Sequence, residues 1–168
     1  WLQSKKRITS FQQLKKNILK RPPRKWINYE SIICKPIKVD NPKKMKLFKR
    51  GYKNLLKDPS IIYDKKKQNI KLHFDMHHGY GILDKAIDVL DEKERNDFRK
   101  FVNTNKSFNR ENMFICRSKK LMNEYFLSVF TWLEKCEQIF GFNLKGYAKT
   151  RVYTFLAERY ISYWFNKY

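Results

Sequence analysis

The chain has 168 residues, of which 38 are Lys or Arg and 16 are Asp or Glu, giving a formal net charge of +22 at neutral pH. This length suffices for one domain with a substantial core, and the apolar runs are too short for a membrane-spanning helix. Three widely spaced cysteines without a CxxC pair argue against a structural zinc framework and predict reduced thiols in the cytoplasm.

The positive charge is concentrated in the first third of the sequence. Residues 1–60 hold 18 basic and 3 acidic side chains, whereas residues 61–168 hold 20 and 13. We therefore read residues 1–168 as a single domain with a basic region, 1–60, and a helical region, 61–168. Such an excess predicts an anionic partner, which leaves open a nucleic acid, a membrane surface rich in anionic lipid and a phosphate-bearing substrate.

The basic region is expected to contain two helices and a strand. A short helix begins at Ser10 and ends before the Pro22-Pro23 pair. The β-branched stretch 31–39 predicts a strand, and Pro36 lies either on a sheet edge or at the exit of that strand. Residues 43–57 predict a cationic amphipathic helix, with apolar residues at a spacing of three to four. That helix suits either packing on the core or lying on a membrane surface.

All three histidines lie in one segment of the sequence. Residues 60–72 predict a strand or extended loop, followed by His73, His77 and His78 with Asp75 between them. These residue types at this spacing can reach one metal ion, but a fourth ligand is not evident, so we assign no metal residues. Gly79 and Gly81 predict a turn, where a histidine can face a cleft.

The remaining elements are predicted from helical periodicity and capping residues. Two helices, or one bent helix, are expected over 82–90 and 91–103, followed by a strand near 112–117. Ser118 is a helix cap and Gly141 a helix terminator, so the strongly periodic stretch between them predicts one long helix. The expected fold is a helix-dominated α/β mixture, with a few-stranded sheet covered by five or six helices.

The last helix, expected from about residue 149, is apolar on nearly every side yet carries one polar stripe. Arg151 and Glu158 are seven residues apart, so they lie on the same face about 10 Å apart along the axis. A charge on an otherwise buried face must be satisfied, either by a structural ion pair or at a functional site. Both interpretations remain open from these residues alone.

Several common chemistries have no motif in this sequence. A Walker loop, GxSxG, HExxH and Cys-His zinc spacings are missing, as is the DxD pair with which many sugar transferases hold a metal-bound nucleotide. Polar residues within apolar elements remain, namely His78, Asn112, Arg151 and Glu158. Such residues are candidates for one convergent site.

Four motifs in the order in which they occur resemble a known family. They are Phe74 with His78, residues 112–115 (Asn-Met-Phe-Ile), residues 125–137 (YFLSVFTWLEKCE) and residues 151–159 (RVYTFLAER). Together they resemble the C-terminal half of a bacterial family of capsular-polysaccharide and lipopolysaccharide glycosyltransferases, long catalogued as a domain of unknown function. Phe74 stands where that family has Tyr, and Thr154 where it usually has Gly.

The resemblance weakens upstream of residue 74. The family's His-Tyr-Arg-Arg segment is similar here only in its basic residues, at Lys6 and Arg7, and its following strand only at residues 29–35. The resemblance implies a later portion of a GT-A-like nucleotide-sugar transferase, whose donor-binding part would precede Trp1. It also implies a cytoplasmic enzyme, peripheral to the inner face of the plasma membrane.

The resemblance further implies roles for individual residues. Sugar transfer from a nucleotide-diphosphate donor to a lipid-linked or glycan acceptor needs a base for the acceptor hydroxyl, and Glu158 or His78 would serve. Asn112 would bind sugar hydroxyls. The leaving diphosphate needs positive charge, for which the candidates are Arg151, Arg159, Lys6 and Arg7. The cofactor is left open, since a divalent metal would require ligands other than a DxD pair.

Two other functions remain open from the sequence. The net charge and the many aromatic residues also fit a nucleic-acid-binding module. The missing DxD pair and the altered His-Tyr segment fit a non-catalytic scaffold domain.

Overall fold

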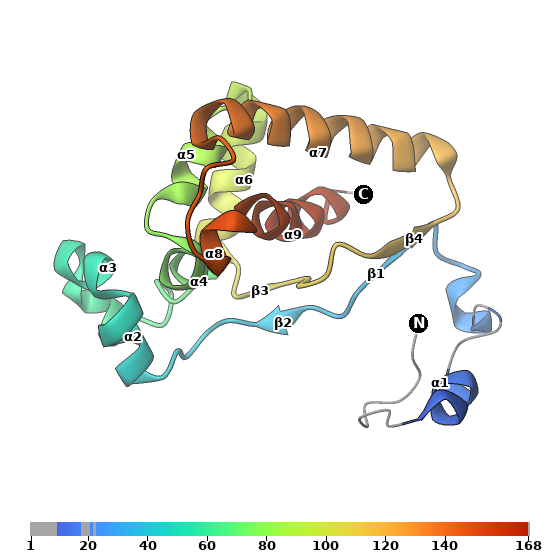
Figure 1. The fold of residues 1–168 in the computed structure, drawn as a ribbon, viewed down its shortest axis with the longest axis horizontal. Helices are drawn as coiled ribbons and strands as arrows, with labels where there is room; N and C mark the ends of the chain where they lie inside the picture. The colour runs from blue at the N-terminus through green and yellow to red at the C-terminus, as the bar shows by residue number, and fades with distance from the viewer. Residues whose placement is uncertain (1–9, 18–20, 22, 168) are drawn as a thin grey trace.

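Helices dominate the fold. The structure is a computed structural model, which describes residues 10–17, 21 and 23–167 (Figure 1). The α-helices are α1 Phe11–Asn17, α2 Lys44–Arg50, α3 Tyr52–Lys57, α4 Ile70–His78, α5 Ile82–Asp88, α6 Glu92–Thr104, α7 Lys119–Phe140, α8 Tyr147–Thr150 and α9 Val152–Phe165. Two short 3-10 helices are η1 Arg24–Trp26 and η2 Pro59–Ile62. The strands are β1 Ser31–Ile33, β2 Ile37–Lys38, β3 Ser107–Phe108 and β4 Phe114–Cys116.

The closing helix α9 occupies the centre of the fold. It packs against α7 on one side and against α4 and α6 on another (Figure 1). Most of its apolar residues are buried, as the sequence predicts, and Leu156 and Tyr160 are completely enclosed. The Tyr160 ring stacks on Trp132 of α7, and its hydroxyl donates to the Glu94 carboxylate of α6 at 2.7 Å. Burial of large aromatic rings is the main source of stability at this centre.

The strands form an interrupted antiparallel ribbon under α9. β1 pairs with β4, matching Ile33 with Phe114, and β2 pairs with β3, matching Ile37 with Phe108. Between the two ladders, three residues on one side (34–36) face five on the other (109–113). Residues 109–113 are therefore a bulge with two extra residues, a feature that redirects side chains and often borders functional sites.

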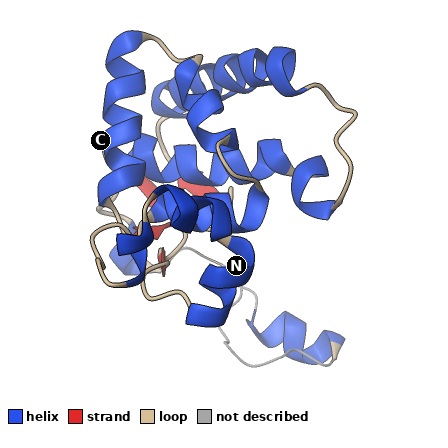
Figure 2. Cartoon of the chain, turned by 90° about the vertical axis from the view of Figure 1, so that its left-hand side faces the viewer, coloured by secondary structure: helices blue, strands red, loops and turns tan. Residues whose placement is uncertain are grey.

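The helix-dominated α/β class is confirmed, and several details of the expected fold are wrong. Figure 2 shows that helices are the main elements of the fold, joined by loops and accompanied by short strands. In the described part of the chain, the strands pair as two separate two-stranded ladders instead of one covered sheet. The closing helix is also interrupted at Arg151, which separates α8 from α9. None of the helices in the described part of the chain combines the length and apolarity needed to cross a lipid bilayer.

The prediction of a strand over 60–72 is wrong. Asp58 accepts a hydrogen bond from the Ser60 amide and starts the 3-10 helix η2. Asn69 accepts from the Leu72 amide at 3.0 Å and starts α4. Two side-chain caps so close together favour helical turns over an extended strand, because they satisfy the first free amides of each helix.

The basic helix expected over 43–57 forms as two helices with a different buried face. Leu47 of α2 is 2% exposed and packs with Leu72 and Met76 of α4. Gly51, between α2 and α3, allows this close approach: a Cβ there would lie 2.8 Å from the Leu47 carbonyl oxygen and 3.3 Å from Met76. Of the apolar residues at the 3–4 spacing, Met45, Phe48, Tyr52 and Leu56 point outward, whereas Leu55 packs with the cluster around Leu47.

Candidate functional site

The polar stripe of α9 contains a buried cation next to a nearly buried carboxylate. The Arg159 and Glu158 side chains are 1% and 12% exposed, and Arg159 Nη1 lies 2.9 Å from Glu158 Oε2. The guanidinium is held between two aromatic faces, 4.0 Å from the Phe108 ring centre and 5.1 Å from that of Phe74. A cation inside a core requires such partners, because the removal of an unpaired ion from water costs on the order of several kcal/mol.

Arg159 uses four of its five N–H groups inside the protein. Nη1 donates to Glu158 and to the Phe155 carbonyl at 3.0 Å. Nη2 lies 3.2 Å from His73 Nδ1 and 3.3 Å from His78 Nε2. Because a guanidinium only donates, each of these ring nitrogens accepts. Of the five Arg159 N–H groups, the Nε–H is the one that has no partner among the described residues, and the buried His78 Nδ1 beside it also has none.

Burial keeps both histidines neutral, and the contact with Arg159 determines which ring nitrogen of each accepts. Burial, with the Arg159 charge as the next cause, lowers the pKa of His73 to about 3 and that of His78 to about 3. Both rings are therefore neutral at physiological pH, with His73 protonated on Nε2 and His78 on Nδ1. The three histidines pack against one another along α4, with His73 stacked on His77 at 4.4 Å.

At this site, the group whose pKa lies closest to neutral pH is the Glu158 carboxyl. Burial raises the pKa of its carboxyl to about 7, the positive charge of Arg159 opposes the shift, and the negative charge of Glu111 adds to it. Arg151 and Arg110 also lower this pKa. The Glu158 carboxyl is therefore influenced by charges of the bulge, at Arg110 and Glu111, and by Arg151 at the start of α9. A carboxyl poised near pH 7 is suited to accepting a proton in a reaction.

The bulge at 109–113 is anchored to α9 by side chains. The Asn109 amide donates to Ser162 Oγ at 2.6 Å, and this hydroxyl lies 3.0 Å from Asn109 Oδ1, to which it donates. About two turns nearer the start of α9, Asn112 Nδ2 donates to the Thr154 carbonyl at 3.1 Å. Because these two anchors bracket Glu158 along the helix, the bulge lies alongside its carboxylate.

A cleft opens beside this cluster. It has a volume of ≈ 500 Å³ and is lined by Arg50, Met76, His77, His78, Tyr147 and Phe155. We call it the histidine cleft. His78 and Phe155 stack at 3.8 Å and connect it to Arg159, which contacts both residues. Arg151 lies at its rim, 5.2 Å from the Tyr147 ring centre and 5.4 Å from that of Phe155.

The structure brings together some of the residues predicted from the sequence. Glu158, Arg159 and His78 form one contact cluster. Arg151 is exposed and donates to the Tyr147 hydroxyl, so the ion pair of Glu158 is made with its neighbour Arg159 and not with Arg151. Asn112 uses its amide N–H to hold the helix backbone.

Two predicted residues, Lys6 and Arg7, lie outside the described residues. Three further residues around the cluster, His73, Asn109 and Glu111, were not predicted as site residues from the sequence. His73 was grouped with the other histidines only as a metal ligand. Asn109 and Glu111 precede the predicted strand in the polar run Asn-Arg-Glu-Asn, which was the available signal for a bulge.

The histidine segment is arranged for packing and hydrogen bonding. Within the described ranges, no group of three or more His, Cys, Asp or Glu side chains is placed to hold a metal ion. Asp75 instead accepts from Asn54 at 2.8 Å, from Lys71 at 2.7 Å and from the Gly81 amide at 3.0 Å. It thereby ties α3, α4 and the start of α5 together.

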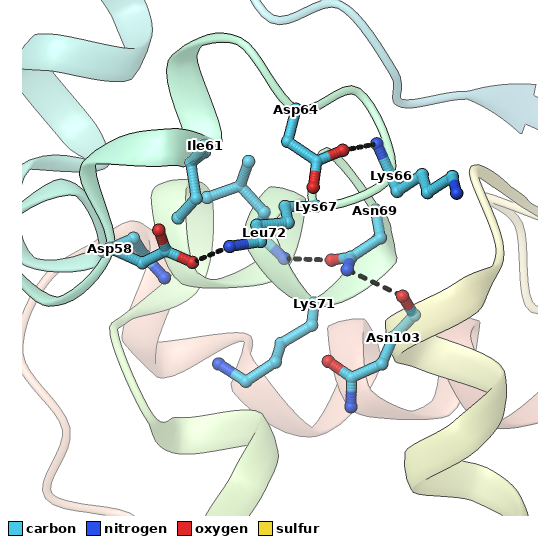
Figure 3. Close-up of a pocket in the computed structure, with 10 residues that line it drawn as sticks. Asp58, Ile61, Asp64, Lys66, Lys67, Asn69, Lys71, Leu72 and Asn103 are labelled. Atoms are coloured by element: carbon cyan, nitrogen blue, oxygen red, sulfur yellow. Dashed lines mark hydrogen bonds and ion pairs between the residues drawn. The ribbon is translucent and has the colours of Figure 1, made fainter.

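A second hollow, of ≈ 450 Å³, lies between η2 and α4 (Figure 3). Its polar side chains bond mainly to one another and to nearby backbone. Asp58 pairs with Lys67 at 2.5 Å, Asp64 accepts from the Lys66 amide at 2.8 Å, and Asn69 donates to the Asn103 carbonyl at 2.8 Å. These groups stabilise the turn before α4, so we place the candidate site at Glu158 and the histidine cleft.

Comparison with known proteins gives a family without an assigned activity. No curated protein and no solved structure matched the chain. Residues 6–168, nearly the whole sequence, match a family described as a domain of unknown function, DUF4422. On this match, the chain belongs to the DUF4422 family.

Proposed function

We propose that this chain is part of a glycosyltransferase that moves a sugar from a nucleotide-diphosphate donor to a cell-surface glycan precursor in capsule or lipopolysaccharide synthesis. The observation that carries the proposal is the Glu158 carboxyl, 12% exposed, with a pKa raised to about 7 and an ion pair to Arg159. The ordered motifs shared with the glycosyltransferase family support the same assignment.

In this proposal Glu158 is the base for the acceptor. The acceptor oxygen bonds to the anomeric carbon of the donor sugar as the bond to the diphosphate oxygen breaks. The hydroxyl proton passes to Glu158, and the nucleoside diphosphate leaves with the bonding electron pair. A carboxylate with a pKa near the working pH accepts a proton effectively and can release it again.

His78 and Arg159 then have positioning roles. A ring with a pKa near 3, whose Nε2 accepts from Arg159, is a poor proton acceptor at neutral pH. Arg159 is 1% exposed and commits four N–H groups to the protein, so it orients Glu158 instead of touching a diphosphate. Neutral histidines suit this role because they accept hydrogen bonds without repelling the guanidinium.

Exposed cations would attract the leaving diphosphate. Arg151 and Arg110 both act electrostatically on Glu158, and Arg151 lies at the rim of the histidine cleft. Cations placed where negative charge develops stabilise the transition state of such a transfer. The cleft, with Tyr147 and Phe155 on its walls, would hold one substrate.

The remaining parts of the proposal concern the whole enzyme. We propose a GT-A-like fold in which the donor-binding part precedes this chain, in the cytoplasm at the inner face of the plasma membrane. The acceptor would be a lipid-linked or free glycan. A divalent metal is compatible with this scheme if the donor-binding part supplies its ligands.

The test is transfer by the whole enzyme and by its Glu158→Gln variant. Release of nucleoside diphosphate would be followed for uridine- and guanosine-diphosphate hexoses, with a lipid extract of the source cells as acceptor. Loss of a general base lowers the rate by roughly 10²–10⁴-fold. Glu124→Gln, an exposed change on α7, is the matched control. Unchanged turnover by Glu158→Gln, or no release from any donor by the unaltered enzyme, contradicts the proposal.

A further inference from the structure

The outer face of α2 and α3 combines exposed apolar side chains with a dense positive charge. Met45 and Leu56 are each 80% exposed, and Phe48 and Tyr52 are each 52% exposed. These four residues recur at a spacing of three to four and so form one stripe on a nearly continuous helix. We call it the α2–α3 face. The opposite side, at Leu47, is buried against α4, so the stripe cannot also reach the core.

The charge around the stripe has one sign. Residues 41–57 contain seven basic and no acidic side chains. All seven are exposed: Lys43, Lys44, Lys46, Lys49, Arg50, Lys53 and Lys57. None of them forms an ion pair within the part of the chain that the structure describes. The charges therefore stay available for an anionic partner.

We propose that the α2–α3 face docks on a lipid bilayer that contains anionic lipid. A helix with Lys and Arg flanking an apolar stripe lies in the headgroup region, where the stripe enters the acyl boundary and the cations meet lipid phosphates. Nucleic acid would satisfy the cations, but it offers little to bury aliphatic side chains such as Met45 and Leu56. The combination of both features therefore selects the bilayer.

Docking in this orientation also places the candidate site. Arg50 is the last residue of α2 and lines the histidine cleft together with His77 and Phe155. The cleft thus opens next to the docking helix, on the side of α2 that faces α4. Docking would therefore keep the cleft close to the membrane surface. The docking does not depend on the proposed chemistry at Glu158.

The test is co-sedimentation of the full chain with phosphatidylcholine vesicles, with and without phosphatidylserine. One variant removes apolar contacts, Met45→Ser with Leu56→Ser, and a second removes charge, Lys44→Gln, Lys49→Gln and Lys53→Gln. Binding is expected only with phosphatidylserine. Each lysine contributes about fivefold to the affinity for vesicles, so the lysine variant should lose affinity on the order of 100-fold. The apolar variant should lose affinity by about tenfold or more.

Matched controls use the exposed side of α7. Leu127→Ser with Phe130→Ser removes two apolar side chains that are 74% and 62% exposed. Lys119→Gln, Lys120→Gln and Lys135→Gln remove the same charge as the lysine variant. Both controls should bind vesicles like the unaltered chain, as should Glu158→Gln. Helix content measured by circular dichroism shows that each variant is folded.

Several results would overturn the proposal. They are equal binding to neutral vesicles, no binding at all, unchanged binding by either α2–α3 variant, and equal losses in the α7 controls. The same variants are also tested for binding to a single-stranded oligonucleotide, the alternative ligand. If the oligonucleotide binds tightly, and only the lysine variant weakens it while vesicles do not bind, the α2–α3 face belongs to a nucleic acid.

Discussion

Glu158 and Arg159 are neighbours in sequence and partners in space, joined at 2.9 Å with almost no exposure to solvent. Adjacent side chains on a helix point about 100° apart and do not normally face each other. The pair forms because Phe74 and Phe108 enclose the guanidinium, while His73 and His78 accept from its other side. The helix α4 and the ribbon thus determine the geometry of the carboxylate on α9.

The first prediction concerns the stability contributed by Arg159. Arg159→Met should destabilise the fold by about 3–5 kcal/mol, because it leaves Glu158 buried without its cation. Urea denaturation gives the free energy of unfolding. Arg151→Met is the matched control on the same helical segment. Arg151 is exposed, so this change should stay within about 0.5 kcal/mol.

A double variant separates loss of the ion pair from loss of packing. Adding Glu158→Gln to Arg159→Met removes the uncompensated charge and should recover part of the lost stability. If the two changes instead add with no coupling, the ion pair does not determine the energetics of this cluster.

The second prediction is a loss of stability in acid. The pKa values of His73 and His78 fall from 6.5 to about 3 on folding. Between these values the unfolded chain binds protons that the folded chain does not, so the free energy of unfolding decreases as the pH falls from 6.5 towards 3. The pKa of His77 is also lowered by burial, which acts in the same direction.

Glu158 acts in the opposite direction over part of this range. Its pKa rises from 4.5 to about 7 on folding, so its contribution stabilises the fold as the pH falls from 7 to 4.5. Glu158→Gln should therefore make the loss of stability steeper between these values. A His73→Gln, His78→Gln variant should make it shallower. Thermal denaturation across this pH range measures both, and identical pH dependence in all three proteins would contradict the assignments.

The third prediction concerns the bulge. Ser162 Oγ accepts from the Asn109 amide and lies within hydrogen-bond distance of Asn109 Oδ1 and of the Glu158 carbonyl. Ser162→Ala leaves buried polar groups unpaired and should cost about 1–3 kcal/mol. Thr104→Ala, which removes an exposed hydroxyl, is the control and should cost much less. Equal unfolding free energies for the two variants would show that the bulge is not anchored by Ser162.

The fourth prediction distinguishes the role of Arg151 from that of Arg159. Arg151 is exposed at the cleft rim and bonds to Tyr147, so Arg151→Gln should leave stability within about 0.5 kcal/mol. Its loss should lower turnover by about 100-fold if it stabilises the leaving diphosphate. Arg151→Lys keeps the charge and should recover part of the rate. Full activity in Arg151→Gln would remove this residue from the proposed mechanism.

Sequence patterns predicted the elements that carry their own capping signals. The helix between Ser118 and Gly141 is confirmed at both ends: the Ser118 hydroxyl accepts from the Leu121 amide, and Gly141 has a φ of 62°. Asp91 likewise caps α6. The stretch 60–72 was mistaken for a strand because its β-branched residues outweighed the capping potential of Asp58 and Asn69.

The candidate site was predictable only as a set of unusual residues. Polar side chains on the apolar α9 marked Glu158, but its partner could not be derived from helical spacing. The Arg159 contact depends on two phenylalanine rings, Phe74 and Phe108, that lie far away in the sequence. The orientation of α2 was left open, because a 3–4 apolar spacing identifies a stripe without showing which way it points.

The most direct test of the account is the pH dependence of sugar transfer by the whole enzyme. With Glu158 as the base and its pKa near 7, kcat/KM should rise about tenfold per pH unit below that value and level off above it. The Glu158→Gln enzyme should keep only a low rate without this rise. An unaltered profile in Glu158→Gln, or no inflection near pH 7 in the unaltered enzyme, would contradict the central role of Glu158.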